Sequence, residues 1–416
     1  MSFLPKFEEI KLENGLQIVA IPTSTSSVVS VDIFYKVGSR NEIMGKNSGV
    51  AHMLEHLNFK STEKLKAGEF DEIVKGFGGV TNASTGFDYT HYFVRCSNSN
   101  LDKTLELFAD MMQNLKLSDD EFQTERKVVA EERRWRTDNN PMGLLYFTLF
   151  NSAFVYHPYH WTPIGFMDDI LHWDIQIIKE FYKAYYQPNN AILVVSGDIS
   201  SQKLFEVAKK HFDNIKGFES PKPYAVEPKQ LGAKRVVLKK QSEVEILALA
   251  WKIPNFEHKD MPELSALAHI LGSGKSSRLY AKLVDSLKIA NSISVYAMEQ
   301  KDPGLFLILA VCNEGIKAEQ VEAEIRAEIL KIQKTGLKQS EIDKLKISVK
   351  ADLIFNLESA DHVSELFGEY LARGNLKPLL EVEATMDALT PQGLQRIAKE
   401  YFKDETSTTI TLINDK

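Results

Sequence analysis

The sequence predicts an α+β protein of two similar halves, each a mixed, mostly antiparallel sheet packed by helices. The chain has 416 residues, more than one ordinary hydrophobic core accommodates. In each half, strand-like segments come first, long helical patterns follow, and a further strand closes the half. Segregated strands and helices favour α+β layers over a doubly wound parallel sheet.

A weak internal repeat supports the division into halves. The strand-like residues 91–96 and 306–312 end in Cys96 and Cys312, which are 216 residues apart. Residues 31–37 and 245–251 are also strand-like and lie at nearly the same offset. A constant offset of about half the chain predicts two α+β sandwiches of related architecture.

Individual elements follow from periodicity and end signals. In the first half, the clearest strands are expected at residues 28–37, 90–96 and 190–196. Its clearest helices are expected at residues 101–115 and 121–137, the second ending before Asn139-Asn140-Pro141. The second half predicts helices at residues 317–334 and 339–358 and a last strand at residues 407–412.

The segment between the halves predicts an extended linker, because residues 217–228 include three prolines. We therefore expect one domain at residues 1–216, a linker at 217–229 and a second domain at 230–416.

Composition is that of an ordinary soluble globular protein, with 44% hydrophobic and 26% charged residues. The net charge of −7 and the scattered lysines and arginines give no case for nucleic-acid binding. Two cysteines cannot form a disulfide framework, and we expect buried free thiols. No apolar stretch approaches 18 residues and no signal-peptide core follows the first residues, so we expect a cytoplasmic chain without a membrane span.

The most informative motif is His52-Met53-Leu54-Glu55-His56. On a helix the two histidines lie one turn apart on one face, and Glu55 borders that face. Two imidazoles and a carboxylate in this arrangement can hold a zinc ion and a base beside its bound water. A helix can also carry such residues as a solvated face, but the neighbouring residues are mainly apolar, which favours a buried site. Zinc then needs a third protein ligand from elsewhere.

A candidate for that ligand lies in the charged helix expected at residues 121–137. Glu125 and Glu132 are seven residues apart, which is two turns, and share a face. Glu131 is rotated by about 100° from Glu132 and is expected to point elsewhere. Charged helices are usually solvated, so the spacing of the glutamates alone does not identify a third metal ligand.

The spacing of these residues resembles a known family, the M16 (pitrilysin-like, inverzincin) metallopeptidases, in their single-chain bacterial and processing-peptidase-like branch. The family has the H-x-x-E-H order and a ligand glutamate 76 residues after the second histidine, where this chain has Glu132. Glu125 matches the family's additional glutamate. Residues 14–16, 78–83 and 196–198 also resemble family segments, so that the resemblance covers nearly the whole chain.

The resemblance implies one zinc ion per chain, with His52, His56 and Glu132 as ligands and water in the fourth position. Glu55 would act as general base on that water and then as general acid toward the leaving amine. Glu125 would orient a ligand histidine through its other ring nitrogen. A ligand set of two histidines and a glutamate also accepts manganese or cobalt.

Substrate residues are expected in both halves. An extended peptide could add to the polar edge strand predicted after Gly79, which makes Asn82 and Ala83 candidates for substrate binding. In the family, the second half completes a clamshell-like substrate chamber and contributes an arginine and a tyrosine. Arg278 matches that arginine, whereas Asn291 stands where relatives have the tyrosine. Tyr296, five residues further on, is a candidate substitute.

Three functions remain open. The first is a zinc metalloendopeptidase that hydrolyses peptides or unfolded short polypeptides. The second is a catalytic subunit that needs a homologous partner chain, as a homodimer or heterodimer, since the family tyrosine is missing. The third is a non-enzymatic core or assembly subunit, although such relatives usually lose the metal ligands. Asn58, where relatives usually carry an apolar residue, is a smaller departure from the family pattern.

Overall fold

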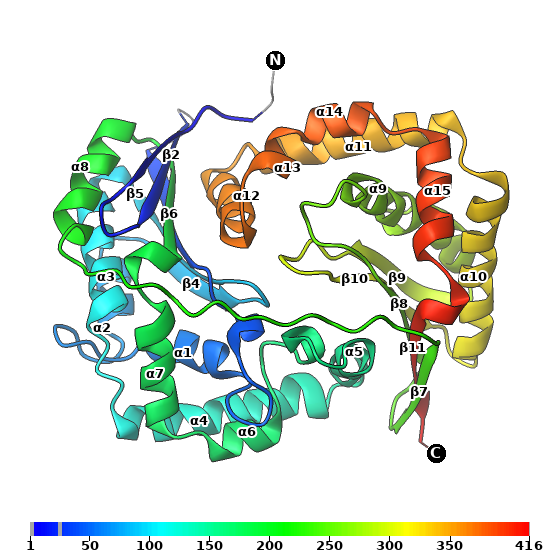
Figure 1. Cartoon of the computed structure of the whole chain (residues 1–416), viewed down its shortest axis with the longest axis horizontal. Coiled ribbons are helices and arrows are strands. Elements are labelled where there is room, and N and C mark those ends of the chain that lie inside the picture. Colours follow the sequence, from blue (N-terminus) through cyan, green and yellow to red (C-terminus); the bar gives the residue numbers. More distant parts are fainter. Residues whose placement is uncertain (1–3, 24–26, 416) are drawn as a thin grey trace. The chain divides into compact units, whose positions relative to one another are not determined.

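The computed structural model describes residues 4–23 and 27–415, which form two compact units. Unit 1 comprises Met1–Glu131, Trp161–Tyr224 and Asp352–Leu380. Unit 2 comprises Glu132–His160, Ala225–Ala351 and Glu381–Lys416. Each unit is built around one mixed sheet with helices on both faces (Figure 1).

The sheet of unit 1 has six strands in the order β1-β2-β6-β3-β5-β4. The strands are β1 (Glu8–Lys11), β2 (Gln17–Pro22), β3 (Val28–Tyr35), β4 (Val80–Thr85), β5 (Thr90–Ser97) and β6 (Ala191–Gly197). All neighbours pair antiparallel except β2 and β6, which are parallel. The strand β4 therefore forms one edge of the sheet.

Helices cover both faces of this sheet. They are α1 (Val50–Asn58), α2 (Glu69–Gly76), α3 (Leu101–Gln113), α4 (Asp119–Arg133), α6 (Met167–His172), α7 (Ile175–Tyr185), α8 (Ser201–Phe212), α12 (Ala360–Arg373) and α13 (Lys377–Leu380). The helices α1, α3, α7 and α8 enclose the main core on one face. The helix α12 packs on β3 and β6 from the other face, where a smaller apolar cluster lies (Figure 1).

Unit 2 repeats this design with five strands in the order β7-β11-β8-β10-β9. The strands are β7 (Lys234–Lys240), β8 (Ile246–Lys252), β9 (Ala290–Ala297), β10 (Leu305–Cys312) and β11 (Ser407–Asn414). Only β7 and β11 pair in parallel. The helices are α5 (Pro141–Ala153), α9 (Met261–Gly272), α10 (Ala318–Thr335), α11 (Gln339–Asn356), α14 (Val382–Asp387) and α15 (Pro391–Tyr401).

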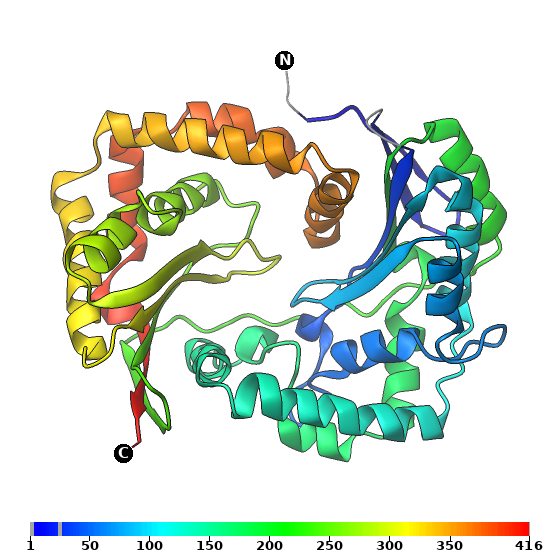
Figure 2. The same cartoon turned by 180° about the vertical axis from the view of Figure 1, so that it is seen from behind.

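In unit 2 the helices α9, α10 and α15 share one apolar core, and α5 packs on β7, β8 and β11 (Figure 2). The predicted repeat is confirmed: β3 corresponds to β8 and β5 to β10, and each sheet has one parallel pair followed by antiparallel neighbours. The predicted α+β class is confirmed, and the strands and helices expected from the sequence lie within a few residues of their predicted bounds.

The compact units are not contiguous in sequence, whereas the domains predicted at 1–216 and 230–416 are. The reason is that α5, from the first half of the chain, covers a face of the second sheet, while α12, from the second half, covers a face of the first sheet. The division in the first half falls inside α4, between Glu131 and Glu132.

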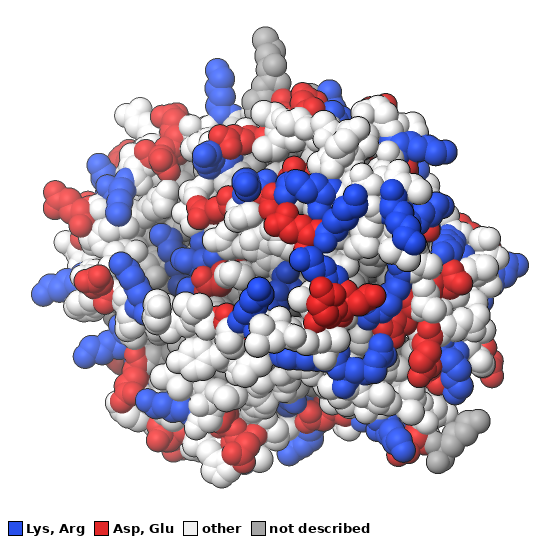
Figure 3. Space-filling model, turned by 45° about the vertical axis from the view of Figure 1, so that its right-hand side comes forward, with Lys and Arg blue, Asp and Glu red and all other residues white. Residues whose placement is uncertain are grey.

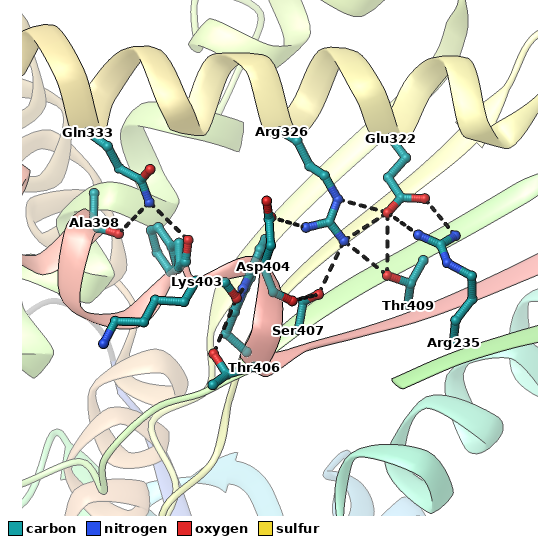
Figure 4. A network of polar contacts seen from close by, with 12 residues as sticks. Arg235, Glu322, Arg326, Gln333, Ala398, Lys403, Asp404, Thr406, Ser407 and Thr409 are labelled. Carbon is teal, nitrogen blue, oxygen red and sulfur yellow. Dashed lines mark hydrogen bonds and ion pairs between the residues drawn. The ribbon is translucent and has the colours of Figure 1, made fainter. Parts of the chain in front are cut away.

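A buried polar network fixes α10 to the sheet of unit 2 (Figure 4). The Glu322 carboxylate accepts two hydrogen bonds from Arg235 and one from Arg326. Arg326 also donates to Asp404, Ser407 and Thr409. Glu322 is buried, so these two cations compensate a charge that would otherwise destabilise the fold.

The surface carries charges of both signs (Figure 3), and both thiols lie in the interior. Lys and Arg are interspersed with Asp and Glu over the face shown in Figure 3. Cys96 and Cys312 are buried free thiols, as predicted. Among residues 4–23 and 27–415, the helices are all too short or too polar to cross a bilayer.

Candidate metal centre

The helix α1 carries the His52, Glu55 and His56 side chains, and its N-terminus is held by a buried carboxylate. Gly49 precedes the helix with φ 87°, and a side chain there would collide with a neighbouring backbone carbonyl. Glu42 accepts hydrogen bonds from the Gly49 and Ala51 N–H groups at 2.7 and 2.8 Å. These contacts satisfy N–H groups at the start of the helix and so fix its position.

The Glu42 carboxylate accepts a third hydrogen bond, at 2.8 Å, from the indole N–H of Trp161. Burial raises the pKa of this carboxyl to about 8, although the three N–H donors favour its charged form. Sequence reasoning missed Glu42, because its partners lie up to 119 residues away.

His52, His56 and Glu132 come together as a potential metal-binding group. Their ligand atoms all lie within 4.8 Å of one another, and all three side chains are partly accessible. The two imidazole rings have centroids 4.7 Å apart. Tetrahedral zinc places its ligand atoms roughly 3.4 Å apart, so small side-chain rotations suffice. The donor set therefore fits zinc.

Glu132 reaches this position from the last turn of α4. In the structure its carboxylate pairs with Arg136 at 2.9 Å, one turn further along the chain. Arg136 belongs to a π-helical turn, Arg134–Asp138, which directly follows α4. Glu131 is exposed and outside the metal-binding group, as its rotation on the helix predicts.

Glu125 lies two turns before Glu132, and its carboxylate contacts the His56 ring at Nδ1. His56 Nδ1 is 2.9 Å from Glu125 Oε1, and Lys60 Nζ is 2.7 Å from Glu125 Oε2. Burial raises the pKa of the Glu125 carboxyl, but hydrogen bonds from His56 and Lys60 lower this pKa more, so that the net shift is downward. The carboxylate thus holds Nδ1 as a donor and leaves Nε2 for a metal.

Lys60 is a further residue that sequence reasoning missed. It lies four residues after His56, and this helical spacing was the available signal, although α1 ends at Asn58.

Glu55 contacts the half-buried Thr85 and lies near two buried tyrosine hydroxyls. Thr85, the last residue of β4, donates a hydrogen bond from its hydroxyl to Glu55 Oε2. Asn58 donates to the Tyr92 hydroxyl at 2.8 Å, and Tyr92 and Tyr186 share a hydrogen bond of the same length. Burial raises the pKa of both tyrosines, so they remain neutral. The unusual Asn58 is therefore explained by a buried polar partner.

The predicted substrate residues Asn82 and Ala83 lie on β4, at the edge of the sheet. Asn82 is exposed, whereas Ala83 packs against the core below. The Ala83 N–H donates to Asn82 Oδ1 at 2.9 Å, so this group has a side-chain partner.

Arg278 and Tyr296 belong to unit 2. The Arg278 guanidinium donates two hydrogen bonds to Glu341, at 2.6 and 2.8 Å, and one to Glu328 at 2.9 Å. Both carboxylates compensate its charge within its own unit. Tyr296, on β9, has 52% of its surface exposed. The sequence did not predict the two carboxylate partners of Arg278, which are 50 and 63 residues away.

The two-sheet architecture and the H-x-x-E-H group on α1 define a class, the pitrilysin-like metallopeptidase fold. Comparison with known proteins then gives the family. Residues 17–156 match the family described as insulinase (peptidase family M16), and residues 172–349 match the peptidase M16 inactive domain. The chain is 54% identical to the zinc protease PqqE of Helicobacter pylori, over 99% of this chain and 94% of that protein. This chain belongs to peptidase family M16.

More distant relatives extend the comparison. The β subunit of the mitochondrial-processing peptidase from Mus musculus is 25% identical, over 97% of this chain and 83% of that protein. Among solved structures, a protease from Helicobacter pylori matches with a TM-score of 0.96 and 54% identity, covering 98% of this chain and 99% of that one. A putative M16-like peptidase from Alicyclobacillus acidocaldarius matches with a TM-score of 0.87 at 17% identity, covering 99% and 98%, and shows the fold alone.

Proposed function

We propose that this chain is a zinc-dependent endopeptidase that hydrolyses peptides or unfolded short polypeptides. One observation carries the proposal: His52, His56 and Glu132 bring their ligand atoms within 4.8 Å of one another, and Glu55 lies on the same helix as the histidines. The relatives named zinc proteases support this assignment of the metal and of the reaction class.

Each residue of the group has a separate role. The two histidines and Glu132 would hold one zinc ion, which would polarise the scissile carbonyl and lower the pKa of a water molecule. Glu55 takes the proton of that water and delivers it to the leaving amine. Glu125 keeps the His56 ring oriented, with Nδ1 toward the carboxylate.

The edge strand β4 is the proposed substrate-binding element. An extended peptide adds to this edge through main-chain hydrogen bonds, and the N–H of Ala83 supplies one of them. In the unliganded chain that N–H is engaged by Asn82. Binding of a peptide therefore requires the Asn82 side chain to turn away, which frees its amide to contact the substrate.

A second candidate is a catalytic subunit that acts beside a homologous chain. It is favoured by two observations: Arg278 is already paired with Glu341 and Glu328, and Asn291 stands in place of the family tyrosine. The relative named as the β subunit of a processing peptidase supports the same possibility. A non-enzymatic subunit is disfavoured, because all three metal ligands and Glu55 are present.

The decisive experiment measures cleavage of a quenched, unstructured peptide by the purified chain, with metal content determined on the same sample. Zinc-dependent turnover that is lost in Glu55→Gln and in a chelator supports a self-sufficient peptidase. Bound zinc without turnover refutes self-sufficiency and favours the partner-dependent subunit. Absence of bound zinc refutes both. Glu132→Gln should reduce zinc content, whereas the adjacent, exposed Glu131→Gln should leave zinc content unchanged.

A further inference from the structure

Thr85, the last residue of β4, contacts the proposed general base, and the way this strand faces the helices explains the contact. Along β4, Val80, Asn82 and Ser84 are exposed, whereas the alternate residues are half-buried. Ala83 packs against the main core, and β4 contacts α1. Since strand side chains alternate between faces, Thr85 points to the same side as Ala83, toward α1.

The Thr85 hydroxyl donates its hydrogen bond to Glu55 Oε2. The donor is stiff, because a β-branched side chain in a strand has few χ1 rotamers. Its backbone is also fixed, since Thr85 pairs with Thr90 on β5. Glu55, by contrast, has a long side chain that loses considerable rotamer entropy when it is held in one position.

We propose that Thr85 is a positioning residue, which orients the Glu55 carboxylate and couples it to the strand that receives the substrate. This inference rests on the proposed function. A peptide that pairs along β4 straightens and fixes the strand up to Thr85. Through the hydroxyl, this fixes the carboxylate that must take the proton from water. The hydrogen bond from Thr85 to Glu55 thereby links peptide binding on β4 to proton transfer by Glu55.

If the hydrogen bond only stabilised the packing of β4 against α1, the expected result would differ. In that case, loss of the hydroxyl lowers stability but leaves the turnover of the folded protein unchanged. A positioning role predicts instead that loss of the hydroxyl lowers kcat, because the base is misaligned. KM and zinc content should stay close to those of the wild type.

The test compares Thr85→Val, Thr85→Ser and a matched control, Thr81→Val. Thr81 lies on the same face of the same strand, but its hydroxyl donates to the backbone carbonyl of Phe93 and not to Glu55. We expect Thr85→Val to lower kcat by about 10- to 100-fold, with KM within about twofold. Thr85→Ser should retain most of the activity. Thr81 also lies on the proposed substrate-binding strand, so KM of Thr81→Val is free to change, but its kcat should stay well above that of Thr85→Val. Equal kcat in Thr85→Val and Thr81→Val would overturn the proposal.

A second measurement does not depend on turnover. Melting temperatures of metal-free Thr85→Val, Glu55→Ala and the double variant form a thermodynamic cycle. If the hydrogen bond exists, the double variant loses less stability than the two single variants together. Strict additivity would overturn the contact. Absence of turnover in the zinc-loaded wild type would refute the self-sufficient peptidase and leave the thermodynamic cycle as the test of the contact, whereas normal turnover in Thr85→Val refutes the role of Thr85 alone.

Discussion

Replacing Glu125 by Gln should weaken zinc binding without unfolding the chain. The carboxylate accepts from His56 at 2.9 Å and from Lys60 at 2.7 Å, and only 10% of its side chain is exposed. An amide of the same shape has one oxygen. If that oxygen accepts from His56, the NH2 group faces the lysine, and two donors then oppose each other.

The expected loss of zinc affinity follows from the weakened hydrogen bond between Glu125 and His56. A hydrogen bond to a charged group contributes about 1.5–3 kcal/mol. Loss of the carboxylate that orients a metal-binding histidine typically costs about 10- to 100-fold in metal affinity, which is about 1.4–2.7 kcal/mol. Both routes give the same range, so we expect the zinc dissociation constant to rise by one to two orders of magnitude.

Competition with a chromophoric zinc chelator measures this affinity directly. Lys60→Met tests whether the effect passes through His56, because it removes the cation but keeps the contact between Glu125 and the imidazole. We expect this variant to lose less than about threefold in affinity, since Lys60 is one-third exposed. Zinc affinity within twofold of the wild type in Glu125→Gln would refute the reasoning, provided that the melting temperature is unchanged.

Three further predictions concern stability. Glu322→Gln should destabilise the chain by about 2 kcal/mol at pH 7, because Arg235 and Arg326 lose a charged hydrogen-bond acceptor. Hydrogen bonds from the two arginines lower the pKa of Glu322 below its usual 4.5 despite its burial, so the difference in melting temperature from the wild type should shrink as the pH falls below that value. A difference that stays constant with pH would contradict this. Gly368→Ala should cost about 1–3 kcal/mol in denaturant unfolding, because a Cβ would overlap the Phe34 ring, and an unchanged midpoint would contradict this packing. Arg278→Ala should lower the melting temperature by leaving Glu328 buried without its closest cation, and a loss of turnover at unchanged stability would instead assign Arg278 to substrate binding.

Helical periodicity was sufficient to predict that His52 and His56 share one helix face, and Glu125 and Glu132 another. One-turn spacing in α1 and two-turn spacing in α4 are properties of a helix, and both survive in any packing that keeps the helices intact. The family resemblance supplied the pairing of Glu132 with the histidines. The structure supports that pairing by bringing the ligand atoms together.

The contacts that the sequence could not provide are those between distant elements. Glu55 and Thr85 meet because β4 is placed beside α1, which no local pattern encodes. The sequence also could not predict that α5 covers the second sheet and α12 the first, since an amphipathic helix does not specify which sheet it covers. Gly368 is the residue type that this packing requires, because it permits the close approach of α12 to Phe34.

The geometry of α4 has a consequence for the metal centre as a whole. Seven residues of helix span about 10.5 Å, so Glu125 and Glu132 are fixed relative to each other by the backbone. Glu125 contacts Nδ1 of His56, while Glu132 belongs to the potential metal-binding group. One helix therefore supplies both the carboxylate that orients His56 and a carboxylate of the group that includes His56. Any shift of α4 along α1 changes both contacts together, which makes zinc affinity a direct measure of how these two helices pack.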